Sequence, residues 1–235
     1  MKIYSISDLH LSFSSDKPMF VFGPIWNEHW EKISMDWDSK VQEEDCVLIP
    51  GDLSWALSLK EAEKDLLEIS KRKGIKVFVR GNHDYWCSSS TGIKKIRDSL
   101  PENINIIRHD SFKIGNYVIC GSRGWTIPEK GITASNSDKK ILDREIIRIN
   151  MSLEDALVKK QAEDKLILMI HFPPFNSSYD DSIFTKIFEQ YKVDSVVYGH
   201  LHGKTSKTSL YIEKNNIKYY LTSCDLRNNK LTLIY

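Results

Sequence analysis

The sequence is poor in cysteine and lacks the patterns in which cysteine usually does chemistry. Four cysteines occur in 235 residues, and no two of them form a C-x-x-C pair. Zinc ribbons, thiol redox motifs and dense disulfide frameworks need closely spaced cysteines. The N-terminus also lacks the charged, apolar and small-residue order of a cleaved secretory leader. We therefore expect a reduced, cytoplasmic protein.

An excess of charge of one sign is also missing. The chain has 33 Lys and Arg against 32 Asp and Glu, a formal net charge of +1, and the two signs are mixed throughout. Without a basic stripe, charge gives no support to nucleic-acid binding. Nothing in the sequence indicates an obligate protein partner.

Long hydrophobic runs, repeats and linkers are absent as well. Apolar runs such as 166–170 end after about five residues, whereas a membrane-spanning helix needs roughly 18. No internal repeat, low-complexity segment or Pro/Gly/Ser-rich linker divides the chain. We expect one domain over residues 1–235 and no association with a membrane.

What is present is an alternation of short apolar runs with amphipathic stretches. Helical spacing of apolar residues predicts helices near 26–37, 62–69, 138–162 and 183–191. Between them, apolar runs bounded by turn residues predict these strands: 2–7, 45–49, 75–80, 104–108, 116–121, 165–170, 194–198, 217–223 and 231–235. The alternation indicates α/β layering. A polar turn at 227–229 predicts that the last two strands form an antiparallel hairpin.

Several of these runs end in side chains that bind metals. In open α/β sheets, ligand groups gather at the carboxyl ends of strands, so residues far apart in sequence meet there. Five of the seven histidines lie at such ends, which favours one shared metal site over separate coincidences. The residues concerned are Asp8 and His10, Asp52, Asn82 and His83, His171, and His200 and His202.

Each motif alone also has a structural interpretation. Asp8 and His10 could belong to a capped turn, Asp52 to a simple turn after glycine, and Asn82 to a helix N-cap. His171 could be a half-buried histidine held by the prolines that follow it. The most specific motif is G-H-L-H-G, which presents His200 and His202 between two glycines.

The motifs D-L-H, G-D-L, G-N-H-D, H-F-P-P and G-H-L-H, in this order over residues 8–203, resemble the calcineurin-like metallophosphoesterase superfamily. The resemblance implies a four-layer α/β/β/α sandwich, in which two mixed β-sheets are flanked by helices and carry two metal ions at one end. It implies hydrolysis of a phosphate ester, either a monoester or a diester, with a metal-bridging hydroxide as the nucleophile.

The resemblance also implies a ligand set. It assigns Asp8, His10 and His202 to one ion, Asn82, His171 and His200 to the other, and Asp52 to both as a bridge. The nitrogen and oxygen donors suit two divalent ions such as manganese, iron or zinc.

Further residues are expected to act on the substrate. By resemblance, His83 faces the substrate, where an imidazole can bind phosphate or protonate the leaving oxygen, and we expect Asp84 to orient it. Arg80 and Arg123 are candidates for a phosphate clamp. Trp55 and Trp86 follow site residues by three positions and are candidates for lining the pocket.

The substrate is the least determined part of the prediction. Protein phosphatases of the superfamily carry an arginine just after the second-motif aspartate, where this chain reads G-D-L-S-W-A-L, so that activity is not expected. We expect a small phosphorylated substrate. The alternatives are a nuclease, which the balanced charge argues against, and a catalytically silent scaffold, which usually has lost ligands.

The segment between His10 and Asp52 has two interpretations. It contains Trp26, Trp30 and Trp37 at helical spacing. It either covers the substrate as a cap or packs its tryptophans into the core.

Overall fold

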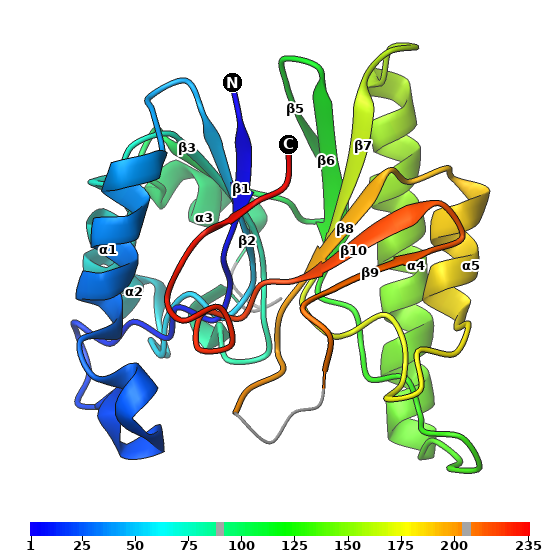
Figure 1. Ribbon diagram of the computed structural model, residues 1–235, viewed down its shortest axis with the longest axis horizontal. Helices are drawn as coiled ribbons and strands as arrows, with labels where there is room; N and C mark the ends of the chain where they lie inside the picture. Colours follow the sequence, from blue (N-terminus) through cyan, green and yellow to red (C-terminus); the bar gives the residue numbers. More distant parts are fainter. Residues whose placement is uncertain (88–91, 204–207) are drawn as a thin grey trace.

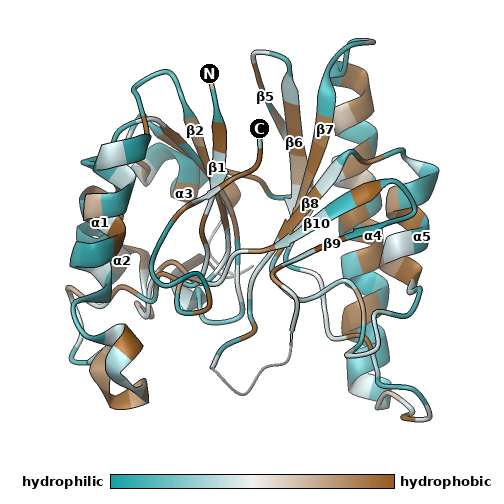
Figure 2. Cartoon of the chain, viewed as in Figure 1, coloured by the Kyte–Doolittle hydropathy of each residue, from teal (hydrophilic) through white to brown (hydrophobic). Residues whose placement is uncertain are grey.

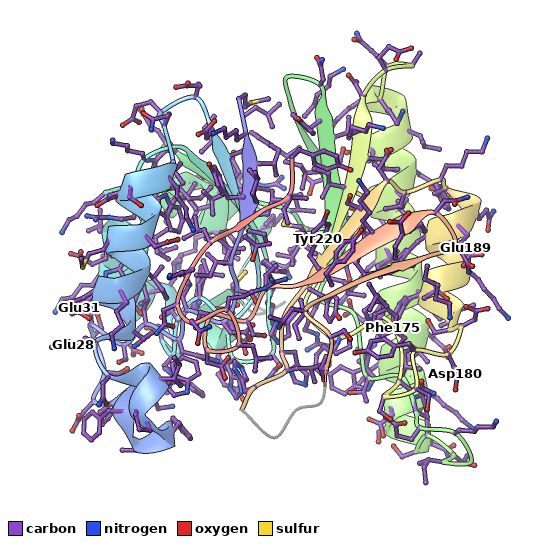
Figure 3. All side chains as sticks on the ribbon, viewed as in Figure 1. Glu28, Glu31, Phe175, Asp180, Glu189 and Tyr220 are labelled. Atoms are coloured by element: carbon purple, nitrogen blue, oxygen red, sulfur yellow. The ribbon has the colours of Figure 1, made fainter. Side chains whose placement is uncertain are left out.

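The computed structural model describes residues 1–87, 92–203 and 208–235, and it has two β-sheets packed face to face. Helices cover the outer face of each sheet, so the layers follow the order helix, sheet, sheet, helix (Figure 1). Side chains fill the space between the layers, while Glu28 and Glu31 point outward at one side of the molecule (Figure 3). The predicted four-layer α/β/β/α fold is confirmed.

The first sheet has five strands in the order β11-β1-β2-β3-β4. The bounds are β1 (Ile3–Ser5), β2 (Cys46–Pro50), β3 (Ile75–Val79), β4 (Ile104–Ile106) and β11 (Thr232–Leu233). Strands β1 to β4 are parallel and β11 is antiparallel to β1. The parallel strands therefore bring their carboxyl ends to one edge.

The second sheet has six strands in the order β5-β6-β7-β8-β10-β9. The bounds are β5 (Ser111–Ile114), β6 (Tyr117–Ser122), β7 (Lys165–Ile170), β8 (Ser195–Tyr198), β9 (Tyr211–Lys214) and β10 (Ile217–Leu221). The four central strands are parallel, and the edge strands β5 and β9 are antiparallel to their neighbours.

Both faces of the central strands are buried, which explains why they read as continuous apolar runs. In β2, Cys46 and Leu48 belong to the cluster between the sheets, whereas Val47 and Ile49 pack toward the helices. Figure 2 shows this as hydrophobic colour along the central strands. Successive residues of a strand point to opposite faces, so one run serves two layers.

Helices α1 to α3 cover the first sheet, and α4 and α5 cover the second. The bounds are α1 (His29–Lys40), α2 (Leu59–Ser70), α3 (Ile93–Ser99), α4 (Asn136–Lys159) and α5 (Ile183–Gln190), with 3₁₀ turns η1 (Met19–Phe22), η2 (Pro24–Trp26) and η3 (Tyr85–Cys87). Ser58, Ser135 and Ser182 cap α2, α4 and α5 with side-chain hydrogen bonds to backbone N–H groups. None of the described helices is long and apolar enough to cross a membrane.

The expected C-terminal hairpin is wrong. Strand β10 pairs with β8 and β9 in the second sheet, whereas β11 pairs with β1 in the first. The chain crosses between the sheets after β10, where Ser223 bridges to Ser7. Arg227 fixes the turn by donating to the carbonyl oxygens of Leu221 (2.7 Å) and Leu210 (2.6 Å).

Candidate metal centre

The polar side chains at the strand ends meet at one end of the molecule, and both sheets contribute. From the first sheet come the residues after β1, β2 and β3, and from the second those after β7 and β8. They are Asp8, His10, Asp52 and Asn82 on one side, and His171, His200 and His202 on the other.

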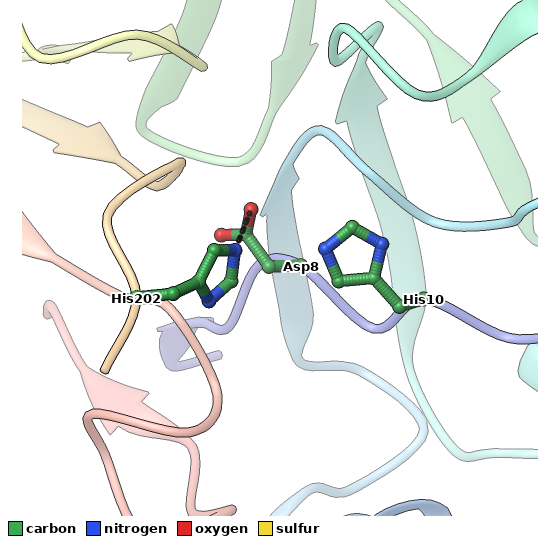
Figure 4. Close-up of side chains that lie close together, drawn as sticks. All are labelled: Asp8, His10 and His202. Atoms are coloured by element: carbon green, nitrogen blue, oxygen red, sulfur yellow. Dashed lines mark ion pairs between the residues drawn. The ribbon is translucent and has the colours of Figure 1, made fainter. Parts of the chain in front are cut away.

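One group consists of Asp8, His10 and His202. One potential ligand atom from each lies within 4.8 Å of the other two. His202 Nε2 is 3.3 Å from Asp8 Oδ1, and the His10 ring lies beside them (Figure 4). The group matches the set that the resemblance assigns to one ion.

A second group consists of Asn82, His171 and His200. Asn82 Oδ1 lies 2.7 Å from His171 Nε2 and 3.0 Å from His200 Nδ1, and the two ring nitrogens are 3.3 Å apart. Three potential ligand atoms therefore converge on one point.

Asp52 lies between the two groups. Its Oδ2 is 3.8 Å from His10 Nε2 and 3.5 Å from His171 Nε2. A carboxylate in this place can reach ions on both sides, as a bridging ligand must.

The hydrogen bonds of the imidazoles fit a divalent cation. His171 Nδ1 lies 2.9 Å from the Pro50 carbonyl oxygen, which can only accept, so the neutral ring keeps a lone pair on Nε2 toward Asn82 and His200. His10 Nδ1 is buried without a hydrogen-bond partner among the described residues. His171 Nε2 and Asn82 Oδ1 thus face each other at 2.7 Å without a proton between them, which suits a cation. Nitrogen and oxygen donors suit manganese, iron or zinc.

The electrostatics of the site point the same way. Burial, and then the carboxylates of Asp84 and Asp8, raise the pKa of Asp52 to about 9. Burial lowers the pKa of His10 to about 3 and that of His200 to about 4. Burial and the neighbouring carboxylates disfavour the ionised form of Asp52, and the His10 and His200 rings carry no charge that would offset it. A bound cation would favour the ionised Asp52 carboxylate.

Four of these residues have left-handed backbones, although none of them is glycine. The φ angles are 60° at Asp8, 47° at His10, 54° at Asp52 and 73° at His200. Such conformations are uncommon outside glycine and concentrate at functional sites. They turn the side chains of these residues toward one another at the strand ends.

Glycines let the loops approach each other closely. A Cβ atom on Gly81 would collide with Asp52 Oδ1 and its backbone nitrogen, and one on Gly199 would collide with Asp8 Oδ2 and Ser7 Oγ. Each glycine therefore leaves space for a candidate ligand carboxylate.

Asp84 does not orient the His83 ring, contrary to our expectation. Its carboxylate is fully buried and accepts hydrogen bonds at 2.8–3.2 Å from neighbouring donors. The donors are the backbone N–H groups of Asp52, Leu53, Ser54 and Gly81 and the Trp86 indole N–H. Among the described residues the His83 imidazole is not a donor to Asp84. The carboxylate instead ties the loop after β2 to the loop after β3.

A pocket of about 480 Å³ opens over the metal-binding side chains. His83 and Trp55 both line it, as expected, with ring centroids 4.4 Å apart. Met19, Phe22 and Trp26 form a further wall. The core interpretation of the segment 11–51 is confirmed, because Trp26, Trp30 and Trp37 all belong to the buried core. Turns η1 and η2 border the pocket, and the cap stays a prediction.

Three expected substrate contacts are placed elsewhere. Trp86 is fully buried, and its indole N–H donates to Asp84 Oδ1 at 3.1 Å, so a ligand in this pocket cannot reach it. Arg80 and Arg123 line a separate cavity and are not among the described residues around the metal-binding pocket.

Asp225 is a site residue that the sequence analysis missed. Its Oδ1 lies 2.9 Å from His202 Nδ1 and its Oδ2 accepts the Gly203 N–H at 2.9 Å. Burial alone would lower the pKa of His202, but hydrogen bonds to Asp225 and Asp8 raise it to about 10. Asp225 closely follows the predicted strand 217–223, so the strand-end rule applied to that strand would have identified it.

Comparison with known proteins places these features in context. The sequence model described as calcineurin-like phosphoesterase matches residues 1–204. No curated protein sequence matches the chain significantly. Solved structures share the fold at low sequence identity.

Two of these structures illustrate the similarity. Phosphopantetheinyl hydrolase from Mycobacterium tuberculosis has 13% identity and a TM-score of 0.60, with 99% of this chain and 95% of that chain covered. A protein from Thermus thermophilus has 13% identity and a TM-score of 0.57, with 98% of this chain and 96% of that chain covered.

Gly81→Ala should weaken metal binding, because the added methyl group displaces the Asp52 carboxylate. We expect the manganese dissociation constant to rise by at least about tenfold, the effect of losing one charged ligand contact. Isothermal titration with Mn²⁺ measures it. Gly92→Ala, whose added Cβ would meet no atom of the described residues within 4 Å, is the control. Equal affinities in the two variants would refute the close-packing argument.

Asp225→Ala should also weaken metal binding, by about 10- to 100-fold, because His202 loses the acceptor that fixes its ring. The same titration measures the change. Asp143→Ala, at an exposed position of α4, is the matched control. An Asp225→Ala variant that binds Mn²⁺ like the wild type would show that Asp225 does not position His202.

Proposed function

The chain belongs to the calcineurin-like phosphoesterase family, and on that premise we propose that it hydrolyses a phosphate ester of a small molecule with the help of two divalent cations. The observation that carries the proposal is the convergence of carboxylate, amide and imidazole ligands from both sheets beneath one pocket.

The proposed ligands fall into the two groups described above. Asp8, His10 and His202 would hold one cation and Asn82, His171 and His200 the other, with Asp52 shared. When bound, the cations would polarise the phosphoryl oxygens and lower the pKa of an attacking water. The chain's own contribution is to hold these ligands rigidly, and no Ser or Cys nucleophile is required. The four cysteines are all buried, as a structural role demands.

His83 is the proposed group for the phosphoryl or leaving oxygen. Its backbone N–H donates to Asp52 Oδ1 at 2.8 Å, which fixes the residue beside the proposed bridging ligand. Its ring is half-buried and faces the pocket between His10 and Trp55. Burial lowers the pKa of His83, so the neutral ring would offer an N–H to a developing negative charge.

The pocket supports a small substrate with an apolar or ring-containing leaving group. Its volume of about 480 Å³ lies within the range of about 300–1,000 Å³ that is usual for small-molecule sites. Trp55 stacks on His10 at 4.8 Å between centroids, and Met19, Phe22 and Trp26 add apolar surface. This wall would bind the organic part of the substrate while the polar floor binds the phosphate.

Metal-loaded protein should cleave p-nitrophenyl phosphate, bis-p-nitrophenyl phosphate or both, and activity should vanish when the metal is removed. Release of p-nitrophenol with added Mn²⁺ measures this. Asp52→Asn, which removes the proposed shared ligand, is the blank for contaminating hydrolases. The ratio of the two rates separates phosphomonoesterase from phosphodiesterase activity. Rates equal to the blank for both esters would count against the proposed hydrolysis.

His83→Ala should lower kcat by about 10²- to 10⁴-fold, the usual contribution of a positioned acid or base. Because His83 is not among the proposed ligands, metal content should stay the same. Steady-state kinetics on the better ester and elemental analysis of the purified variant provide the two measurements. An unchanged kcat at full metal content would remove His83 from the reaction.

A further inference from the structure

A second cavity, of about 160 Å³, has five arginines in its described lining. It lies where the ends of β3, β4 and β6 meet α4, and it shares no lining residue with the pocket over the metal-binding side chains, as far as the described residues go. The charged residues around it are Arg80, Arg108, Arg123, Arg144, Arg148 and Glu145.

The single carboxylate among the described lining residues is already fully engaged. Glu145 pairs with Arg148 Nη1 at 2.6 Å and with Arg123 Nη2 at 3.6 Å. It also accepts the Ser122 hydroxyl and the Gly124 N–H. Glu145 therefore pairs with two of the arginines, and no other carboxylate is present in the described lining.

Two of the guanidinium groups have buried nitrogen atoms without partners among the described residues. Arg80 Nε and Arg123 Nε are both inaccessible and form no hydrogen bond there. Arg123 at least stacks on Trp125, 4.8 Å from the ring centroid, and pairs with Glu145. Buried donors of this kind are normally satisfied, so packing alone does not account for Arg80.

We propose that this arginine-lined cavity binds a phosphoryl dianion, either inorganic phosphate or the phosphoryl group of a small organic molecule. Guanidinium groups match the oxygens of phosphate in charge and fork geometry. The cavity is smaller than the roughly 300 Å³ at which sites for whole small molecules begin, so it fits one phosphoryl group.

Two of the arginines that line the cavity are linked through the backbone to candidate metal ligands. Arg80 stands two residues before Asn82. The backbone carbonyl of Arg123 accepts the N–H of His171 at 3.0 Å. An anion held by these two arginines would therefore restrain the backbone segments that carry Asn82 and His171. The anion site itself does not depend on the proposed hydrolysis.

Calorimetric titration of the metal-loaded full chain with inorganic phosphate tests the proposal, in a buffer of low ionic strength without other multivalent anions. Phosphate should bind in two phases, one at the metal centre and one in the cavity. Asp52→Asn should remove the first phase. Arg144→Gln should weaken the second by about tenfold or more while leaving the first in place, because it removes one charged contact. Arg72→Gln is the matched control, because the Arg72 side chain pairs with Asp38 and neither residue is among those described as lining the cavity.

Arg148→Lys is the second variant, because it keeps a cation beside Glu145 but loses the fork. It should also weaken the second phase by about tenfold. A titration with methylphosphonate in place of phosphate distinguishes the two proposed ligands. If both anions bind in the cavity, the ligand is a phosphoryl group on an organic molecule. If only phosphate binds, the ligand is the free ion. A single phase that disappears in Asp52→Asn and is unchanged in Arg144→Gln and Arg148→Lys would overturn the proposal.

Discussion

The arrangement of the candidate metal centre depends on the buried Asp84 carboxylate. A fully buried charge is costly unless donors surround it, and here four backbone N–H groups and one indole N–H do so. Those donors belong to the loops that carry Asp52 and Asn82. The carboxylate thus fixes two loops from neighbouring strands at one separation, and the remaining candidate ligands assemble around them.

The loops at the candidate metal centre approach each other closely because several of their residues adopt uncommon backbone conformations. Asp8, His10, Asp52 and His200 all adopt left-handed conformations, and Gly81 and Gly199 leave room for the carboxylates of Asp52 and Asp8. Such conformations persist only where the surrounding structure enforces them. The buried strands on both sides hold these loop residues in place, because they pack in the cluster between the two sheets.

Sequence reasoning predicted the layers and the convergence of ligands, because apolar runs and their polar endings are local signals. It missed β5 and β9, whose sequences S-F-K-I and Y-I-E-K are short and only partly buried, as edge strands often are. It placed β10 and β11 in one hairpin because pairing partners are not a local property. Adjacency in sequence also misled the interpretation of Asp84, Trp86 and Arg80, since the neighbours of a ligand can point in other directions once the strand ends. Arg123 is not next to a candidate ligand in sequence, and it lines the same separate cavity as Arg80.

The two sheets contribute different members of each proposed ligand group, Asp8 and His10 with His202, and Asn82 with His171 and His200. A cation held across that boundary would act as a cross-link between the two halves of the molecule. Strands β2 and β7, which lead into Asp52 and His171, are in contact between the sheets, and that contact sets the distance that the cross-link must span. Leu48 and Met169 lie in that interface, so the packing of the core also determines how the two halves of the proposed metal centre are spaced.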